Sequence, residues 1–189
     1  MSTSHPVIIE RIRIGVLIAS LTLLAACSAT NPGASVQPSI TKEAAQVRIL
    51  EYFADTLAVL PAQATLSWES PTPGSDSLGP GVTVPCNDND QTDTGPVNLQ
   101  LDYWIHGMPK GEGINYFESV SKTFADKGWS PQRDIRGPQR IVRGYTNDGY
   151  ALIAQLNVHG DLSLTGSSPC FPKANDHSTT PQPSTVPHP

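Results

Sequence analysis

Hydrophobic and polar residues alternate most clearly between Val97 and His106. Apolar side chains occupy every second position, and polar side chains occupy the positions between them, with Trp104 as the exception. An alternation with a period of two is typical of a strand that is buried on one face and wetter on the other. We therefore predict a strand here, in a sheet that is covered on one face.

Two other segments have apolar residues at spacings of three and four, which is the period of an amphipathic helix. The first begins at an N-cap residue, Thr41, and stops at Pro61. Its predicted apolar stripe is Val47, Leu50, Ala54, Leu57 and Leu60. The second runs from about residue 111 to 127 and stops at Gly128. Its predicted stripe is Ile114, Phe117, Val120 and Phe124.

Short alternating segments joined by turn residues fill the chain after Gly128. We predict four strands there, with turns at Gly137-Pro138, at Asp148-Gly149 and at Gly160-Asp161, the last two being hairpin turns of the primed types. A further short strand is predicted around Trp68. This order of elements favours the α+β class, as a two-layer sandwich with a mainly antiparallel sheet of about four to six strands and two helices on one face.

The N-terminus has the pattern of a secretory signal. Arg11 and Arg13 precede an apolar run from Ile14 to Ala26, which is too short to span a membrane comfortably. The run ends in Leu24-Ala25-Ala26-Cys27, which resembles the bacterial lipobox. The resemblance implies cleavage before Cys27 and a diacylglycerol on its thiol. The alternative is an ordinary secretory signal that happens to contain a cysteine.

A lipid on Cys27 changes what the composition means. Two or three acyl chains anchor a protein almost permanently, so the expected partner is the membrane, with the chain on its extracytoplasmic face. Removal of residues 1–26 takes the formal net charge from −5 to −6, which gives no bulk attraction for nucleic acid. We expect residues 27–39 to be a flexible tether, residues 40–172 to be a single domain, and the Ser/Thr/Pro-rich residues 173–189 to be disordered.

The remaining two cysteines are Cys86 and Cys170. Outside the cytoplasm an even pair is typical of a disulfide, although two buried thiols are the alternative. Cys86 precedes the clearest strand and Cys170 follows the last one. A bridge therefore favours these two strands being antiparallel and close together.

Few residues suggest chemistry. Asp88, Asp90 and Asp93 crowd together after Cys86, but the sixth position of an EF-hand loop lacks its glycine and the twelfth lacks its acid, so we interpret them as a solvated loop rather than a calcium site. His106 and His159 have no metal-ligand spacing. No G-x-S-x-G and no phosphate-binding glycine motif occurs, so we predict no enzyme, no metal and no cofactor.

Two surface features remain open. Four arginines, Arg133, Arg136, Arg140 and Arg143, lie in one predicted hairpin. They form either a docking site for an anionic envelope component or a charged edge that prevents aggregation, and we favour the edge. Trp104, on the polar face of its strand, either marks a binding surface or packs under the loop before Cys86, and we favour packing.

The lipobox "LLAAC", the polar tether, the "VPC" and "SSPCF" cysteines, "KGW" and "DGYALIAQLN" together resemble the small lipoproteins of mycobacteria and related actinobacteria. The resemblance implies a lipid-anchored cell-envelope protein with a compact α+β fold. We expect a non-catalytic binding or accessory module with a protein or lipid partner in the envelope. The alternatives are a carrier that holds an apolar ligand between helices and sheet, and an envelope hydrolase.

Overall fold

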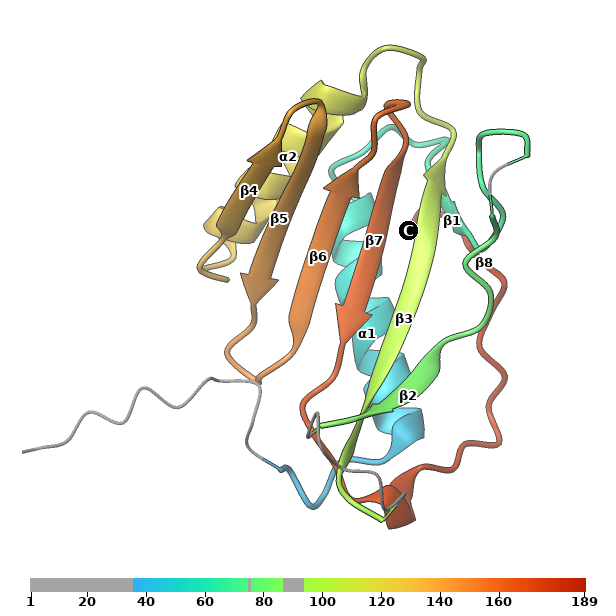
Figure 1. Ribbon diagram of the computed structural model, residues 1–189, viewed down its shortest axis with the longest axis vertical. Coiled ribbons are helices and arrows are strands. Elements are labelled where there is room, and N and C mark those ends of the chain that lie inside the picture. The colour runs from blue at the N-terminus through green and yellow to red at the C-terminus, as the bar shows by residue number, and fades with distance from the viewer. Residues whose placement is uncertain (1–35, 75, 87–93) are drawn as a thin grey trace, which may run out of the picture.

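The computed structural model describes residues 36–74, 76–86 and 94–189, which form two helices, a short 3-10 helix and a sheet of eight strands (Figure 1). The α-helices and the 3-10 helix are α1 (Lys42–Leu57), α2 (Gly113–Asp126) and η1 (Lys173–Asn175). The strands are β1 (Thr65–Ser67), β2 (Val82–Pro85), β3 (Val97–His106), β4 (Gln132–Arg136), β5 (Gln139–Tyr145), β6 (Ala151–Leu156), β7 (Leu162–Ser167) and β8 (Thr185–Val186). The α+β class is as predicted, and the two strands beyond the predicted six are β2 and β8.

The sheet is antiparallel throughout, in the order β4-β5-β6-β7-β3-β1-β8. One edge of β3 pairs with β7, and the other edge is shared by β2 at the start of β3 and β1 at its end. The predicted antiparallel pairing of the strand after Cys86 with the strand before Cys170 is therefore confirmed. β3 is the strand that runs from one end of the sheet to the other.

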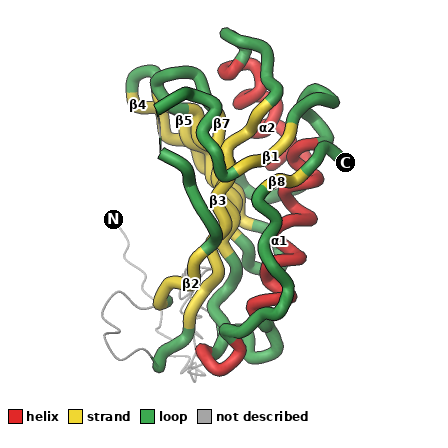
Figure 2. Tube along the Cα trace, turned by 90° about the vertical axis from the view of Figure 1, so that its right-hand side faces the viewer, coloured by secondary structure: helices red, strands yellow, loops and turns green. Residues whose placement is uncertain are grey.

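Both helices cover the same face of the sheet, as Figure 2 shows, and no helix of the described residues covers the other face. The odd-numbered positions of β3 are buried beneath the helices, and the even-numbered positions are half-buried on the open face. This matches the alternation in the sequence. Neither helix has the length and apolarity that crossing a bilayer requires, within the part of the chain that the structure describes.

Helix α1 begins as predicted, because the Oγ1 of Thr41 accepts a hydrogen bond from the amide of Ala44 at 3.1 Å. Its predicted apolar stripe is right only in part, since Leu57 and Leu60 are buried but Val47 is 49% exposed. The buried face is instead Ala45, Gln46, Ile49, Tyr52, Phe53, Thr56 and Leu57. This face includes Gln46, Tyr52 and Thr56, whose side chains carry polar groups. A search for aliphatic residues at helical spacing does not detect them.

Helix α2 follows its predicted stripe more closely. Phe117, Val120 and Phe124 are fully buried, whereas Ile114 is 50% exposed. The helices lie directly on the strands because glycines leave room for them. A Cβ on Gly166 of β7 would lie 2.3 Å from the Cγ2 of Ile49 in α1. The two layers are therefore closely packed.

The hairpin turns lie where the sequence places them, but their predicted types are wrong. In the turn between β5 and β6 the positive φ belongs to Gly149, at +86°, and not to Asp148 as a type I′ turn requires. In the turn between β6 and β7, Gly160 has a φ of +85° but is the last residue of the turn, since its amide bonds to the carbonyl of Asn157. Both are longer loops in which one glycine in the left-handed region closes the turn.

The C-terminal residues are folded, so the predicted disorder of residues 173–189 is wrong. The segment leaves the end of the sheet at η1 and runs back along α1 to β8, which pairs with β1 (Figure 1). The hydroxyl of Tyr103 donates to the carbonyl of Pro183 at 2.6 Å, and the side chain of Gln182 donates to the same hydroxyl at 2.9 Å. Proline-rich composition does not prevent order here, because prolines also lower the entropy of the unfolded chain.

The folded part also begins earlier than predicted. Val36 forms a parallel bridge with Cys170, and the amide of Gln37 donates to the carbonyl of Cys170 at 2.7 Å. Residues 36–39 of the expected tether thus belong to the domain, while residues 27–35 lie outside the described part. The chain therefore enters the domain beside the start of β3.

Candidate functional site

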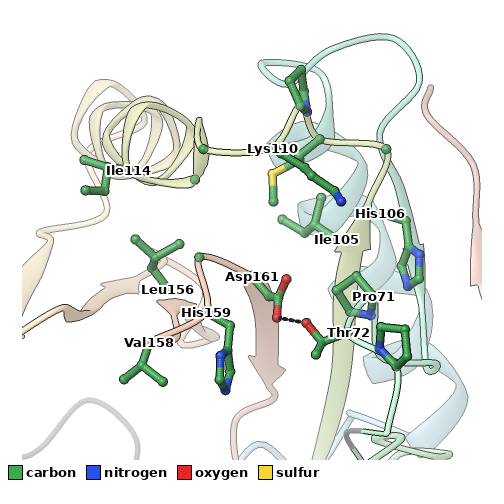
Figure 3. Close-up of a pocket in the computed structure, with 17 residues that line it drawn as sticks. Pro71, Thr72, Ile105, His106, Lys110, Ile114, Leu156, Val158, His159 and Asp161 are labelled. Atoms are coloured by element: carbon green, nitrogen blue, oxygen red, sulfur yellow. Dashed lines mark hydrogen bonds between the residues drawn. The ribbon is translucent and has the colours of Figure 1, made fainter.

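A pocket of about 650 Å³ lies at the end of the sheet where β3 finishes. Three connections surround it: the loop after β1, the loop from β3 to α2, and the turn between β6 and β7. Its volume is in the range of about 300–1,000 Å³ that is typical of small-molecule sites. The lining is drawn in Figure 3 and includes the side chains of Thr72, Ile105, His106, Met108, Lys110, Ile114, Leu156, Val158, His159 and Asp161.

One part of the lining is apolar. Ile105 and Leu156 come from the buried faces of β3 and β6 and are only 1% and 2% exposed. Ile114 and Val158 are 50% and 63% exposed, on α2 and on the turn after β6. An exposed apolar pair above an apolar floor is a surface that a ligand can cover.

The other part of the lining is polar and held in place. The Oδ2 of Asp161 accepts hydrogen bonds from the hydroxyl of Thr72 at 2.7 Å and from the side-chain amide of Asn157 at 3.2 Å. The Nε2 of His106 lies 2.7 Å from the carbonyl oxygen of Glu69 and donates to it. The bonds to Asp161 and His106 connect the loop after β1 to the start of β7 and to the end of β3.

Lys110 is the one lysine of the described residues that has no carboxylate partner. Lys42, Lys122, Lys127 and Lys173 each form an ion pair with an aspartate. Figure 3 shows the amine of Lys110 directed into the pocket, above Asp161 and beside Ile105. The pocket thus contains one unpaired cation in a protein of net negative charge.

The close approach of α2 to the β6–β7 turn shapes the pocket. A Cβ on Gly113 would lie 2.4 Å from the carbonyl oxygen of Gly160 and 2.9 Å from a methyl of Leu156. Only glycine allows the first turn of α2 to lie this near the hairpin. Gly113 is therefore required for the wall that carries Ile114.

A second polar cluster lies away from the pocket, where α1 meets the β5–β6 turn. The Oδ1 of Asp148 accepts from the hydroxyls of Tyr52 and Thr146, each at 2.6 Å, and its Oδ2 accepts from the Nε of Arg48 at 3.0 Å. Burial would raise the pKa of Asp148, but these three hydrogen bonds outweigh it and lower the pKa. Both carboxylate oxygens are engaged, so the cluster ties α1 to the turn.

The four arginines do not form one patch. The strand register places Arg133 and Arg140 on the face that carries α2, and Arg136 and Arg143 on the open face. Two of them are paired with carboxylates, Arg133 with Glu118 and Arg136 with Asp134. The anion-docking alternative is therefore wrong as a single site, because neighbouring positions of a strand point to opposite faces.

Cys86 and Cys170 form a disulfide, with Cα atoms 6.2 Å apart. It joins the residue directly after β2 to the segment that follows β7, at the end of the sheet opposite the pocket. Cys27 and the aspartates Asp88, Asp90 and Asp93 lie outside the described residues. Among the residues that are described, no group of three potential ligands could hold a metal ion.

The structure brings His106 and His159, which the sequence suggested were isolated, into the lining of one pocket. Sequence reasoning missed Lys110 and Val158. Val158 fits the apolar face of the strand that contains Leu156, but β6 ends at Leu156 and the turn carries Val158 outward. The available signal was the glycine- and proline-rich run "HGMPKGEG" after β3, since binding residues are common on such loops.

The fold and this pocket define the chain as a small two-layer α+β domain with a ligand-sized hollow at one end of its sheet. No protein-family model, curated protein or solved structure shows significant similarity to it.

Proposed function

We propose that the protein is a membrane-anchored lipoprotein of the cell envelope whose domain is a non-catalytic binding module. The lipid on Cys27 and the extracytoplasmic location rest on the N-terminal sequence pattern. The binding role rests on one observation, the pocket of about 650 Å³ with an apolar floor and an unpaired lysine. The expected partner is a molecule of the envelope that enters this pocket.

The position of the pocket supports this role. The chain enters the domain beside Cys170 and the start of β3, and the pocket lies at the far end of β3. A strand of ten residues spans roughly 30 Å. A domain tethered through its N-terminal side would therefore hold the pocket away from its point of attachment, open to molecules of the surrounding envelope.

The packing between helices and sheet argues against a carrier that holds its ligand between the layers. Phe53, Tyr103 and Phe117 fill that space and are at most 1% exposed. Gly144 and Gly166 bring the strands so near α2 and α1 that a single methyl group at either position would collide. The end of the sheet is the better place for a ligand than the interior.

Two measurements test the proposal separately. Intact-mass analysis of the protein from its own membrane should give residues 27–189 plus acyl groups, and Cys27→Ser should instead remain an unlipidated chain. A Cys27→Ser chain that is processed and acylated like the wild type would contradict the anchor. Native mass spectrometry of the same membrane-extracted protein should show a stoichiometric ligand.

A matched pair of variants links that ligand to the pocket. Ile114→Asp places a charge in the pocket wall and should remove the bound mass. Ile135→Asp is the control, because Ile135 is 58% exposed on β4 and does not line the pocket. A ligand that survives Ile114→Asp, or a turnover-dependent covalent label from a hydrolase probe, would contradict a non-catalytic binding pocket.

A further inference from the structure

We propose that the pocket binds an amphipathic ligand with a single negative charge, whose head group pairs with Lys110 and whose alkyl part covers Ile114 and Val158. This inference rests on the proposed binding function and names the ligand class for the same site. The shared chemistry of the ligand is an anionic head on an alkyl chain, as in a fatty acid or a phosphodiester lipid.

The head-group assignment follows from the charge of Lys110. An ammonium group without a carboxylate partner is the natural ligand for a carboxylate or phosphate oxygen, and the resulting charge-assisted hydrogen bond is stronger than a neutral one. The other four lysines are all neutralised by aspartates. Lys110 therefore differs from them by having its charge available inside a hollow.

The alkyl assignment follows from what surrounds Lys110. Among the described residues eight large apolar side chains are exposed, and two of them, Ile114 and Val158, line this pocket. Leu156 lies between them, and Ile105 lies farther across the pocket, beside Lys110 (Figure 3). Met108 adds a flexible thioether that adapts to the shape of a chain.

Asp161 limits the charge of the ligand. Its Oδ2 is engaged by Thr72 and Asn157, so the carboxylate is fixed at the pocket and cannot turn away. A head group with one negative charge can lie on the Lys110 side, whereas each further negative charge is repelled by Asp161. Lys110 and Asp161 together therefore favour a ligand with one negative charge, and they orient its head group toward the β3–α2 loop.

Photocrosslinking tests this in the lipid-anchored protein. The mature lipoprotein is placed in nanodiscs of zwitterionic phosphatidylcholine and irradiated with decanoate that carries a diazirine at its alkyl end. Peptide mapping should find the label in residues 105–114 and 156–161. Each methylene removed from the chain should weaken half-maximal labelling by about threefold to fourfold.

Matched probes and variants identify the head group. A diazirine analogue of decanol should label the pocket at least about tenfold less than decanoate, since its neutral head group lacks the charge-assisted bond to Lys110. Lys110→Gln should reduce decanoate labelling by a similar factor, and Asp161→Asn should leave it unchanged or raise it. Lys122→Gln, on the exposed side of α2, is the control and should change nothing, because the side chain of Lys122 is 74% exposed and paired with Asp126.

The outcomes separate the two proposals. A short-chain phosphatidylglycerol probe that competes better than decanoate identifies a lipid phosphodiester as the source of the anion, and the reverse identifies a free carboxylate. Pocket labelling that is equal for decanol, or unaffected by Lys110→Gln, overturns the anionic head group and leaves a binding pocket standing. If no probe labels the pocket and native mass spectrometry finds no ligand, both proposals fail.

Discussion

The two ends of β3 are held in different ways. At its start, the amide of Val97 bonds to the carbonyl of Phe171, the disulfide from Cys86 to Cys170 lies alongside, and Val36 pairs with Cys170. At its finish, β3 pairs with β1 and β7, and the three loops beyond these strands enclose the pocket. We call these the tied end and the pocket end.

The difference separates stability from binding. The disulfide and the bridge from Val36 to Cys170 are at the tied end, next to the place where the chain enters the domain. The pocket end leaves Ile114, Val158 and Lys110 without partners, which costs little stability and keeps them available. Binding residues are often placed on loops that a rigid scaffold positions, and low local stability is common there.

Removing the disulfide should have the largest effect on the tied end. Cys86→Ser with Cys170→Ser opens a link between residues 84 apart in sequence, and loop-closure entropy gives a loss of about 4.5 kcal/mol in the free energy of unfolding. Denaturant unfolding of the oxidised wild type and the double variant measures it. Equal midpoints for the two proteins would show that the tied end does not depend on the bridge.

Truncation of the C-terminal segment should have the next largest effect. A chain that ends at residue 177 loses β8 and both hydrogen bonds to the hydroxyl of Tyr103. A buried hydroxyl without its partners costs about 1–3 kcal/mol, and lost packing of Val186 adds to it, so we expect a loss of about 3 kcal/mol. Thermal unfolding monitored by circular dichroism measures the change.

The control for that truncation removes only residues 187–189. This loses one hydrogen bond to the rest of the domain, between the Nε2 of His188 and the carbonyl of Leu60, and should cost about 1 kcal/mol or less. If the short and the long truncation are equally stable, the segment from 178 to 186 does not contribute to the fold. Proteolysis confined to residues 178–189 in the wild type would point the same way.

The C-terminal segment also shows what the sequence could and could not predict. The layer arrangement and β3 follow from local periodicity, which the sequence displays directly. Residues 173–189 have no period, and they are ordered by distant partners such as Gln46, whose side chain donates to the carbonyl of Pro181 at 3.3 Å. Such partners are set by the tertiary fold, so composition alone predicted disorder.

The pocket was unpredictable for a related reason. Lys110 and Ile114 lie around the start of α2 and Asp161 lies about fifty residues later, so their meeting depends on how closely α2 approaches the β6–β7 turn. Gly113 permits this approach, but nothing in the sequence distinguishes it from other glycines near the start of a helix. The disulfide could be predicted because only one pairing is possible between two cysteines. No comparable rule identifies which residues meet in a pocket.

At the tied end, Asp176 provides a pH-dependent contribution. Its carboxylate contacts the amines of Lys42 at 3.1 Å and Lys173 at 3.0 Å and accepts from the hydroxyl of Thr83 at 2.9 Å. Burial opposes ionisation, but hydrogen bonds from Lys173, Lys42 and Thr83 outweigh it, so the pKa of Asp176 is lowered. The stabilisation is therefore present above the ordinary carboxyl pKa of 3.8 and is lost as the pH falls through the lower folded value.

Asp176→Asn should consequently cost about 1–2 kcal/mol at pH 7 and less in acid. Urea unfolding at pH 7 and at a pH below the ordinary carboxyl value measures the difference between wild type and variant. Asp126→Asn is the matched control, because that side chain is 60% exposed and pairs only with Lys122, so its effect should stay within about 0.5 kcal/mol. A gap between wild type and Asp176→Asn that grows in acid would contradict the lowered pKa of Asp176.

The pocket end should respond least in stability. Val158→Ser and Lys110→Gln change side chains that are exposed or lack partners, so each should shift the free energy of unfolding by less than about 0.5 kcal/mol. Gly113→Ala is the informative contrast, because its methyl group would meet the carbonyl of Gly160 at 2.4 Å and displace α2 from the hairpin. We expect Gly113→Ala to cost about 1–3 kcal/mol by overpacking and to weaken ligand binding, while the other two weaken binding alone. Unfolding and crosslinking measurements on the same three variants test this expectation. If Lys110→Gln loses as much stability as Gly113→Ala, the lysine contributes to the scaffold and not to the binding site.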